Sequence, residues 1–456
     1  MTAFLRPTRR TFLAGLALAV PATVRASPLL SEVDFRGALN APDYGIHPGT
    51  LDRGSKAFIK LLKEASARNM PVFLPPGTYE ISNIDLPDNV RLQGVAGATR
   101  LVYGGEGKFL GATGAKFISL SGLVIDGANR WLADDQQGLV TFRSISNLTI
   151  EDCEIAGAAK FAIWAEGSSG KIAGNTISGA AESAIYAVDN SDFEIRDNRI
   201  SDCGNGGILV HRWTKGRDGT IVSGNRIQRI AAHGGGTGQN GNGINIFRAD
   251  DVLISDNHIS NCAFTAIRSN AGSNVLISAN HCTNSGETAI YSEFGFEGAV
   301  IANNVIDGAA NGILSVNFNE GGRLAVISGN LIRNLKLTAP YEAEDALFGI
   351  GLEAEAEASV TGNVIENAPR WGMLLGWGPY GRNISATGNV VRKAKVGCAV
   401  TVVEGAGPIL VRNNQFSDCS EAAISGYRWI EKSSGELASN DGKEFPHIDI
   451  GGNQVS

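Results

Sequence analysis

Hydrophobic and polar positions alternate along this chain in short runs, and each run contains an asparagine at the same place. In the copy around Asn257, the apolar residues Val252 and Ile254 precede the asparagine and Ile259 follows it. Such alternation predicts half-buried β-strands on both sides of the asparagine. A period in the twenties that varies by insertion predicts a solenoid. The repeated asparagines are Asn175, Asn198, Asn225, Asn257, Asn280, Asn304, Asn330, Asn363, Asn389, Asn414 and Asn453.

Each repeat is interpreted as one coil of a parallel β-helix, and parallel crossovers generally favour the right-handed form. Asparagine tolerates the left-handed backbone region, so we expect each one to occupy a tight corner. Stacked about 4.8 Å apart, the side chains can form a hydrogen-bonded ladder, which we favour over a row of ligand-binding amides. A degraded copy has Cys153 in place of the asparagine. The sequence therefore predicts an all-β fold, a right-handed parallel β-helix of about a dozen coils.

Residues 1–26 are predicted to be a twin-arginine (Tat) signal peptide. Arg9 and Arg10 precede an apolar run that is too short for a permanent membrane span, and residues 24–26 offer a cleavage site. The sequence thus predicts the Tat export machinery as a partner, a periplasmic or secreted location, and no stable membrane span.

Loss of this segment removes four arginines and no acidic residue, which changes the formal net charge from −7 to −11. A net-acidic mature chain without a basic stripe argues against nucleic acid as a partner. Local arginines can still bind an acidic polysaccharide.

The six cysteines are expected to be buried free thiols and not disulfides. Cys203, Cys262 and Cys419 each lie five residues after a repeated asparagine, where other coils carry alanine. This pattern indicates an inward column of small apolar groups. Cys203 and Cys262 are expected two coils apart, about 10 Å, which is too far for a disulfide.

Residues 27–95 are predicted to form an N-terminal cap with the first strands, followed by β-helix repeats over 96–456. Ser55 can cap an amphipathic helix, and a helix laid across the open first coil would bury its core side chains. The apolar face of this helix is predicted to consist of Phe58, Leu61, Leu62 and Ala65.

Three segments of this region carry a resemblance to a known superfamily: 43–45 (Asp-Tyr-Gly), 74–79 (Leu-Pro-Pro-Gly-Thr-Tyr) and 90–94 (Val-Arg-Leu-Gln-Gly). They resemble the entry segment of the pectate-lyase-like right-handed β-helices. That resemblance implies an extracellular polysaccharide lyase, glycoside hydrolase, epimerase or phage tailspike. The chain as a whole also resembles an uncharacterised family of Tat-exported repeat proteins from alphaproteobacteria, whose repeat has been suggested to bind a cofactor.

Candidate chemistry is concentrated on one column of side chains. In each coil a further strand begins with a small residue followed by Ile, Met or Val. With that second residue inward, the first and third residues after it are expected to face solvent. Aromatic rings mixed with charged and amide groups suit a sugar chain lying along the helix axis. The substrate-binding candidates are Trp164, Tyr186, Arg212, Asn245, Arg248, Asn270 and His233.

Two long insertions, 231–242 and 335–347, are expected to form the walls of a groove on this column. The two walls are expected four rungs apart, about 19 Å. In the pectate-lyase-like superfamily the active groove occupies this same sheet, as the resemblance implies. The catalytic candidates are Arg268, Tyr291, Glu293 and His211.

Roles depend on the reaction. In β-elimination of a uronate polymer, Arg268 would pair with the substrate carboxylate, and Tyr291 or His211 would take or return a proton. Hydrolysis needs two carboxylates at a set separation, and Glu293 has only Glu353 near it, two coils or about 10 Å away. The paired aspartates and Gly-His-Gly segment of polygalacturonases and the calcium-binding aspartates of pectate lyases are missing from the sequence.

Metal and cofactor signals are sparse. His258 and His281 are expected on adjacent rungs and could share a metal, although the sequence offers no third ligand. The acidic run Glu353, Glu355 and Glu357 is interpreted as a solvated strand, with calcium as the alternative. A Gly-rich phosphate loop is missing.

Two function classes follow. The first is an exported carbohydrate-active enzyme, a polysaccharide lyase ahead of a hydrolase or an epimerase, acting on an acidic glycan bound along the groove. The second is a non-catalytic envelope protein that binds a glycan or a cofactor. Fold alone does not decide between them.

Overall fold

The computed structural model describes residues 37–49, 56–236, 238–316, 321–342, 347–440 and 442–456. The chain divides into two units, Met1–Ala38 and Leu39–Ser456, and the elements below belong to the second. The predicted signal segment 1–26 and the predicted cap Ser55 lie outside the described residues.

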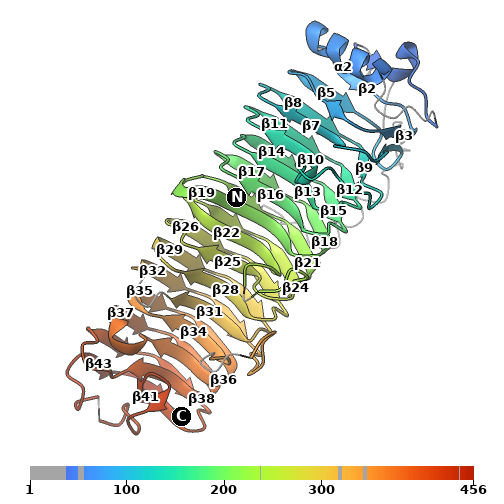
Figure 1. The fold of residues 1–456 in the computed structure, drawn as a ribbon. Coiled ribbons are helices and arrows are strands. Elements are labelled where there is room, and N and C mark those ends of the chain that lie inside the picture. The colour runs from blue at the N-terminus through green and yellow to red at the C-terminus, as the bar shows by residue number, and fades with distance from the viewer. Residues whose placement is uncertain (1–36, 50–55, 237, 317–320, 343–346, 441) are drawn as a thin grey trace, which may run out of the picture. The chain divides into compact units, whose positions relative to one another are not determined.

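Short strands of successive coils pair side by side and form three columns (Figure 1). The strands that precede the repeated asparagines form a 16-stranded sheet, called the first face below. Its strands are β1 (Leu39–Asn40), β2 (Val72–Phe73), β5 (Val90–Gln93), β8 (Ile118–Ser121), β11 (Leu148–Glu151), β14 (Gly170–Ala173), β17 (Phe193–Arg196), β20 (Ile221–Ser223), β23 (Leu253–Ser255), β26 (Val275–Ser278), β29 (Glu297–Ala302), β32 (Arg323–Ser328), β35 (Ala356–Thr361), β37 (Arg382–Thr387), β39 (Ile409–Arg412) and β43 (Ile448–Gly451).

The strands that follow the asparagines form the second face. They are β3 (Gly77–Ile81), β6 (Thr99–Tyr103), β9 (Val124–Asp126), β12 (Glu154–Ala156), β15 (Thr176–Ser178), β18 (Arg199–Cys203), β21 (Arg226–Ile230), β24 (His258–Cys262), β27 (His281–Thr283), β30 (Val305–Asp307), β33 (Leu331–Arg333), β40 (Gln415–Ser417) and β44 (Gln454–Val455). The first parts of β36 (Val364–Leu375) and β38 (Val390–Thr401) complete this face.

The next strands of the same coils form the third face. They are β4 (Ile84–Asp85), β7 (Leu110–Thr113), β10 (Gly138–Arg143), β13 (Phe161–Glu166), β16 (Ser183–Val188), β19 (Gly206–Arg217), β22 (Asn242–Asp250), β25 (Ile267–Asn270), β28 (Thr288–Glu293), β31 (Asn311–Val316), β34 (Ile350–Ala354) and β41 (Ala422–Arg428). The second parts of β36 and β38 continue this face, so the second and third faces form one 28-stranded sheet. Apart from β41 with β42 (Glu431–Lys432), the described strands pair in parallel, and the predicted parallel β-helix is confirmed.

The core consists of apolar side chains that point inward from all three faces. In one coil these are Ile254, Ile259 and Ile267, and each is at most 1% exposed. The same positions of the next coil lie directly against them, as in the pairing of Ile254 with Ile277. Full burial of one such side chain contributes about 1.5–3 kcal/mol. Repetition of this small unit therefore builds one continuous core.

The asparagines form the predicted ladder, and every amide in its interior is satisfied. The Asn257 Oδ1 accepts hydrogen bonds from the backbone N (2.9 Å) and Nδ2 (3.0 Å) of Asn225. Its own Nδ2 donates to the Val222 carbonyl (3.0 Å) and to Asn280 Oδ1 (3.0 Å). The same bonds recur down to Asn414 and Asn453, so the ladder joins each coil to the next.

The left-handed backbone conformation occurs one residue earlier than expected. The residues that adopt it immediately precede a ladder asparagine, as Asp197 (φ 57°) and Asp256 (φ 58°) do, whereas no ladder asparagine has positive φ. The asparagine itself must stay extended, because its backbone N–H and its side-chain amide both bond to neighbouring coils. The preceding residue therefore makes the corner.

One helix lies at the end of the stack, beside β2 and β5 (Figure 1). In α2 (Lys56–Arg68) the predicted apolar face is confirmed, because Phe58, Leu61, Leu62 and Ala65 are fully buried. The other described helices are the 3-10 turns η2 (Ala41–Tyr44) and η3 (Gly378–Tyr380). Within the described ranges, no helix has the length and apolar character that crossing a membrane requires.

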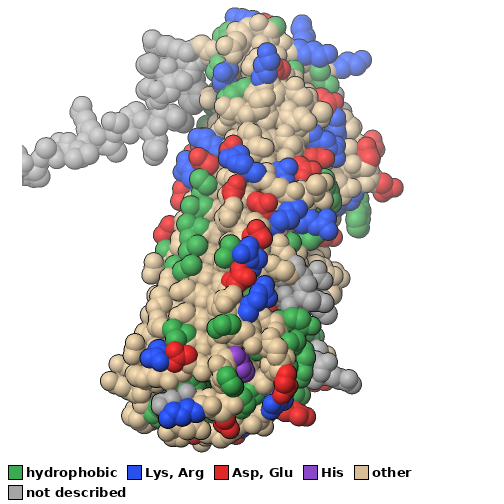
Figure 2. Space-filling model, turned by 90° about the vertical axis from the view of Figure 1, so that its left-hand side faces the viewer, with side chains coloured by type: hydrophobic (Ala, Val, Ile, Leu, Met, Phe, Trp, Pro, Cys, Tyr) green, Lys and Arg blue, Asp and Glu red, His purple; other side chains and the backbone are tan. Residues whose placement is uncertain are grey.

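Ion pairs link neighbouring coils on the surface. On the side drawn in Figure 2, acidic and basic side chains lie beside one another along the stack. On the first face, Arg323 Nε lies 2.7 Å from Glu357 Oε2, and the two side chains are 37% and 21% exposed. Exposed pairs of this kind contribute about 0–1 kcal/mol each, so the surface adds little to the stability given by the core.

All six cysteines are free, and five are buried. Cys203 and Cys262 are two coils apart, as predicted, with Ile230 between them. Burial raises the pKa of Cys203 to about 11 and that of Cys262 to about 12. Cys419 is half-buried and not buried as predicted, since its face ends one coil later, where β40 pairs with β44.

In native protein, five thiols are expected to resist a disulfide-exchange reagent, while Cys419 reacts first. The reason is that the attacking thiolate is scarce at neutral pH and inaccessible in the core. Peptide mapping of labelled native and denatured protein measures this order. A Cys–Cys bridge in unreduced protein, or fast labelling of Cys262, would contradict it.

Candidate functional site

The outward side chains of the third face form two rows that run along the stack. Alternate residues of a strand share a face, and the parallel pairing places equivalent residues of successive coils side by side. The first row is Leu209, Asn245, Arg268, Tyr291, Leu314 and Glu353. The second row is His211, Phe247, Asn270, Glu293 and Val316.

These rows are less exposed than the sequence-based prediction expected, because five of their eleven residues are buried and the other six are half-buried. Glu293 is 3% exposed and Glu353 is 7% exposed. Neighbouring outward side chains pack on one another, and the two insertions lie against them. The result is a pair of partly open cavities on this face.

The first insertion, 231–242, lies directly on Arg268. A Cβ atom added to Gly238 would stand 1.7 Å from Arg268 Nη1, and the φ of +129° at this position also favours glycine. The Gly238 carbonyl accepts a hydrogen bond from Asn242 Nδ2 (2.7 Å), and the Gln239 carbonyl accepts one from Asn245 Nδ2 (3.4 Å). The insertion is thus fixed to the strand that follows it.

The second insertion covers the next coils. The Tyr341 hydroxyl donates to Glu287 Oε1 (2.7 Å), and the Tyr341 ring stacks on Phe264 with centroids 6.0 Å apart. Asn311 Nδ2 donates to the Leu347 carbonyl (3.0 Å). Described residues of this insertion therefore close the face over β28 and β31.

Arg268 is the centre of a buried ionic network. Its Nε donates to Glu293 Oε1 (2.6 Å) and its Nη2 to Glu293 Oε2 (2.8 Å), which makes the pair bidentate. Its Nη1 lies 3.4 Å from Glu287 Oε2, and Asn270 Nδ2 also donates to Glu293 (2.9 Å). The guanidinium also lies 5.0 Å from the centre of the Tyr291 ring. The structure thus brings four predicted residues, Arg268, Asn270, Tyr291 and Glu293, into contact.

Sequence reasoning missed Glu287 and Tyr341. Glu287 lies directly before β28, outside the outward positions that strand periodicity identifies. Its place in the site depends on the hydrogen bond from Tyr341, which belongs to a loop. Tyr341 belongs to the insertion that the sequence marked as a wall, but strand periodicity says nothing about side chains inside a loop. The only signal for Tyr341 was a tyrosine within a long insertion.

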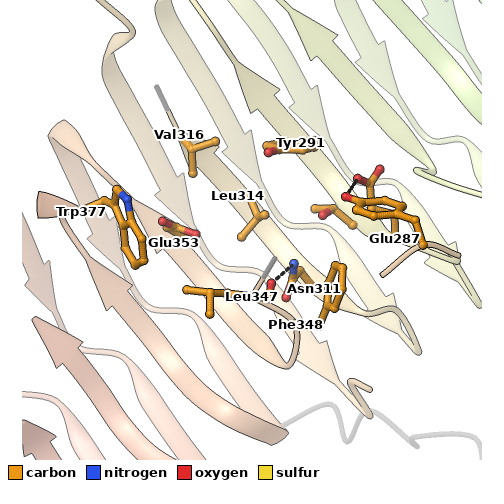
Figure 3. Close-up of a pocket in the computed structure, with 11 residues that line it drawn as sticks. Glu287, Tyr291, Asn311, Leu314, Val316, Leu347, Phe348, Glu353 and Trp377 are labelled. Carbon is orange, nitrogen blue, oxygen red and sulfur yellow. Dashed lines mark hydrogen bonds between the residues drawn. The ribbon is translucent and has the colours of Figure 1, made fainter. Parts of the chain in front are cut away.

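A cavity of about 170 Å³ opens beside Tyr291 (Figure 3). It is several times larger than the roughly 30 Å³ that one water occupies in the liquid. Apolar and aromatic walls surround polar side chains that include Glu287, Tyr291 and Glu353. The other lining residues are Thr288, Asn311, Leu314, Val316, Tyr341, Leu347, Phe348 and Trp377.

Two of these groups have pKa values above their usual range. Burial raises the pKa of the Glu353 carboxyl well above its usual range, and the charge of Glu355 adds to the effect. Burial also raises the pKa of Tyr291, and the charge of Glu293 contributes. Among the described residues, neither Tyr291 nor Glu353 has a hydrogen-bond or ion-pair partner. Both can therefore donate an O–H hydrogen bond to a ligand.

A second cavity of about 350 Å³ lies on the other side of Arg268. His211 lines it, and burial lowers the pKa of His211 to about 4, so the ring is neutral at pH 7. Its Nε2 atom is buried without a hydrogen-bond partner among the described residues. The other lining residues are Trp213, Gly238, Gln239, Asn245, Phe247, Arg268 and Asn270.

The remaining candidates lie apart from both cavities. Trp164 and Tyr186 stack with ring centroids 4.4 Å apart, and Tyr186 contacts the His211 ring at 5.1 Å. They belong to an aromatic column that leads along the third face toward the second cavity. Trp164 and Tyr186 are 9% and 6% exposed, so they present only edges to a ligand.

The three further basic candidates make local contacts. Arg212 donates to the Asn190 carbonyl (3.1 Å). Arg248 lies 4.7 Å from the centre of the Phe247 ring. His233 is exposed, and its backbone N–H bonds to Gly204 (2.9 Å). None of the three lines either cavity.

The metal candidates come together only in part. The rings of His258 and His281 lie on adjacent rungs with centroids 5.5 Å apart. The described part of the chain contains no group of three or more His, Cys, Asp or Glu side chains placed to hold a metal ion. Within the acidic run, Glu353 is buried and faces the first cavity, while Glu357 pairs with Arg323 and Arg382.

Solved structures that resemble this chain have low sequence identity to it. The N-terminal fragment of bacteriophage phi29 gene product 12 is 15% identical, with a TM-score of 0.54 over 93% of this chain and 71% of that chain. The A-module of a mannuronan C-5 epimerase from Azotobacter vinelandii is 13% identical, with a TM-score of 0.41 over 91% of this chain and 99% of that chain. A mannuronic acid specific family 6 polysaccharide lyase from human gut microbiota is 14% identical, with a TM-score of 0.44 over 91% and 90%.

No curated protein sequence matches this chain. A family model does match it: the model for the right-handed beta helix region covers residues 108–238 and 214–430. These segments span more than half of the chain and coincide with the parallel coils described above. This protein therefore belongs to the right-handed β-helix family.

Proposed function

We propose that this protein is an exported carbohydrate-active enzyme that cleaves an acidic polysaccharide by β-elimination at the cavity beside Tyr291. The observation that carries the proposal is the pair of neutral O–H donors, Tyr291 and Glu353, in one cavity with a carboxylate, Glu287. Residues 1–26 would direct export through the Tat machinery to the periplasm or beyond.

The neutral donors suit the intermediate of this reaction. Removal of the proton next to a uronate carboxylate moves an electron pair onto that carboxylate and forms an enediolate. Tyrosine and a protonated carboxylic acid in an apolar site stabilise such an oxyanion by hydrogen bonds. Tyr291 and Glu353 occupy the same outward row with Leu314 between them, about 10 Å apart along the stack.

The proton route needs no external reagent. Glu287 takes the proton from carbon as a general base. The electron pair then forms the carbon–carbon double bond and expels the glycosidic oxygen, which receives the proton from Glu287. One C–H bond and one C–O bond break, and one double bond and one O–H bond form.

Arg268 has a different role from the one that the sequence suggested. Its Nε and Nη2 atoms are already engaged by Glu293, so they are not free for a substrate carboxylate. We assign to Arg268 the positioning of Glu287 and Glu293. His211, Asn245 and Asn270 would contact the sugar that enters the second cavity.

Turnover on a panel of acidic and neutral polysaccharides tests the proposal. Tyr291→Phe is expected to lower kcat by at least about 100-fold, because one oxyanion-stabilising donor is lost while the ring remains. The control is Tyr44→Phe in η2, which keeps turnover. Ultraviolet absorbance of unsaturated products measures the rate.

The pH profile tests Glu353 separately. Glu353 acts as a donor only when protonated, so the rate should fall as pH rises through its raised pKa. Glu353→Gln keeps an N–H donor without a titrating proton and should remove that alkaline limb. Unchanged turnover in both Tyr291→Phe and Glu353→Gln would refute the site. No degradation of any polysaccharide by the wild type would favour the non-catalytic binding protein.

Hydrolysis is the second candidate, because the carboxyl groups of Glu353 and Glu287 line one cavity and the pKa of Glu353 is raised. Glycoside hydrolysis uses such an acid and carboxylate pair. New reducing ends without ultraviolet absorbance would identify this reaction in the same assay.

A further inference from the structure

A column of four basic side chains runs along the second face. The residue directly after the ladder asparagine is Arg199 in β18, Arg226 in β21, His258 in β24 and His281 in β27. The four residues pair in register from one coil to the next, and all are exposed. In sequence they are 23–32 residues apart, so no basic stripe is visible there. The ladder fixes their alignment.

The two arginines of this column have no counter-charge. Among the described residues, neither the Arg199 nor the Arg226 side chain has a hydrogen-bond or ion-pair partner. The arginines beside them differ: Arg196 pairs with Asp197 (2.9 Å), and Arg229 pairs with Asp202 (2.6 Å). The protein is acidic overall, with a formal charge of −7, so an uncompensated basic column is a local exception.

The column lines a groove. A cavity of about 580 Å³ opens along these strands, and hydroxyl and amide side chains flank the basic groups. These flanking polar groups are Thr176, Ser201, Gln228, Ser260 and Thr283. Burial lowers the pKa of His258, and the charges of Arg226 and His281 add to this effect. The site thus combines cationic and hydrogen-bonding groups.

The groove has defined ends. Thr176 precedes Arg199 in the column, and the apolar Val305 follows His281. Beyond that end, Asp307 pairs with Arg333 (2.8 Å). Four rungs at about 4.8 Å give a basic stretch of about 14 Å.

We propose that this second-face groove binds a segment of a linear acidic polysaccharide, with carboxylates at Arg199 and Arg226 and with the two histidine rings as further hydrogen-bonding partners. Each sugar of a uronate chain carries one carboxylate, and Arg199 and Arg226 offer two cationic groups on adjacent rungs, about 4.8 Å apart. Its hydroxyl groups match the flanking serine, threonine and glutamine side chains. No Phe, Tyr or Trp lines the groove, so it offers no platform for the base stacking that single-stranded nucleic acid uses.

This groove lies on a different face from the Tyr291 cavity and does not depend on the proposed reaction. It would hold the polymer without cleaving it. Binding here and turnover at Tyr291 can therefore be measured and lost independently.

Titration of full-length protein with oligogalacturonates of defined length tests the proposal. The double variant Arg199→Ala/Arg226→Ala is expected to lose at least about tenfold in affinity, and its binding should depend less on salt. Both side chains are exposed, so folding should be unaffected. The matched control is Arg196→Ala/Arg229→Ala, which removes the same charge from the same coils but from paired arginines.

Three outcomes would overturn the proposal. The first is an equal loss in the control variant, which would mean non-specific attraction. The second is equal binding of neutral oligosaccharides, and the third is tighter binding of single-stranded DNA than of oligogalacturonate. A Tyr291→Phe enzyme that keeps its turnover would refute the proposed reaction but leave this binding result intact.

Discussion

Replacing Asn257 by alanine is expected to lower the stability of the surrounding coils by at least about 2 kcal/mol. The variant removes the side-chain bonds to the Val222 carbonyl and to the Asn225 backbone N–H in a fully buried position, and Asn280 Oδ1 keeps only the bond from the backbone N–H of residue 257. Each unsatisfied buried group costs about 1–3 kcal/mol. Urea unfolding and amide hydrogen exchange in 221–283 measure the loss.

Asn453→Ala is the matched control for this change. Asn453 is the last member of the ladder, is half-buried, and has no later ladder asparagine to bond to. Water can replace its lost bonds, so the cost there should be below about 1.5 kcal/mol. Equal losses at the two positions would mean that the ladder adds no stability of its own.

Arg268→Ala is expected to destabilise the third face by about 3–5 kcal/mol, because the change leaves buried carboxylates unpaired. Glu287 and Glu293 side chains are each 4% exposed, so water cannot compensate for the lost guanidinium. Thermal melting of the variant and the wild type measures the loss.

Two variants sharpen this test. Arg323→Ala also removes an arginine that pairs with two carboxylates, Glu297 and Glu357, but at an exposed site. Its cost should stay below about 1 kcal/mol. The triple variant Arg268→Met/Glu287→Gln/Glu293→Gln removes all three charges and should recover much of the stability. If Arg268→Ala melts like Arg323→Ala, Arg268 is not a structural ion and remains available to a substrate.

The parts of the fold that repeat could be predicted from sequence. Asn257 and its equivalents revealed the ladder because the asparagine amide makes the same hydrogen bonds in every coil. Phe58, Leu61 and Leu62 revealed the helix face through their spacing. The left-handed residue was predicted one position too late, at the asparagine itself. Backbone propensity favours asparagine in that conformation, but it does not show that the asparagine N–H group hydrogen-bonds to the next coil.

The candidate site could be predicted only in outline. Arg268, Tyr291 and Glu293 were found because they sit at periodic outward positions. Glu353 pairs with Leu314 and shares the row of Tyr291, although alternation counted from Ile350 would place it in the row of Val316. The second insertion hides this shift of two residues. The burial of both rows depends on loop conformations, which no local pattern specifies.

The ladder has a consequence for the evolution of such chains. Its donor–acceptor distances between neighbouring side-chain amides stay between 2.9 and 3.1 Å, although the intervening segments vary from 23 to 39 residues. Loop lengthening therefore leaves the register of the scaffold unchanged. A lineage can gain, lose or exchange loops on one coil without disturbing its neighbours, so new specificities can arise on a constant framework.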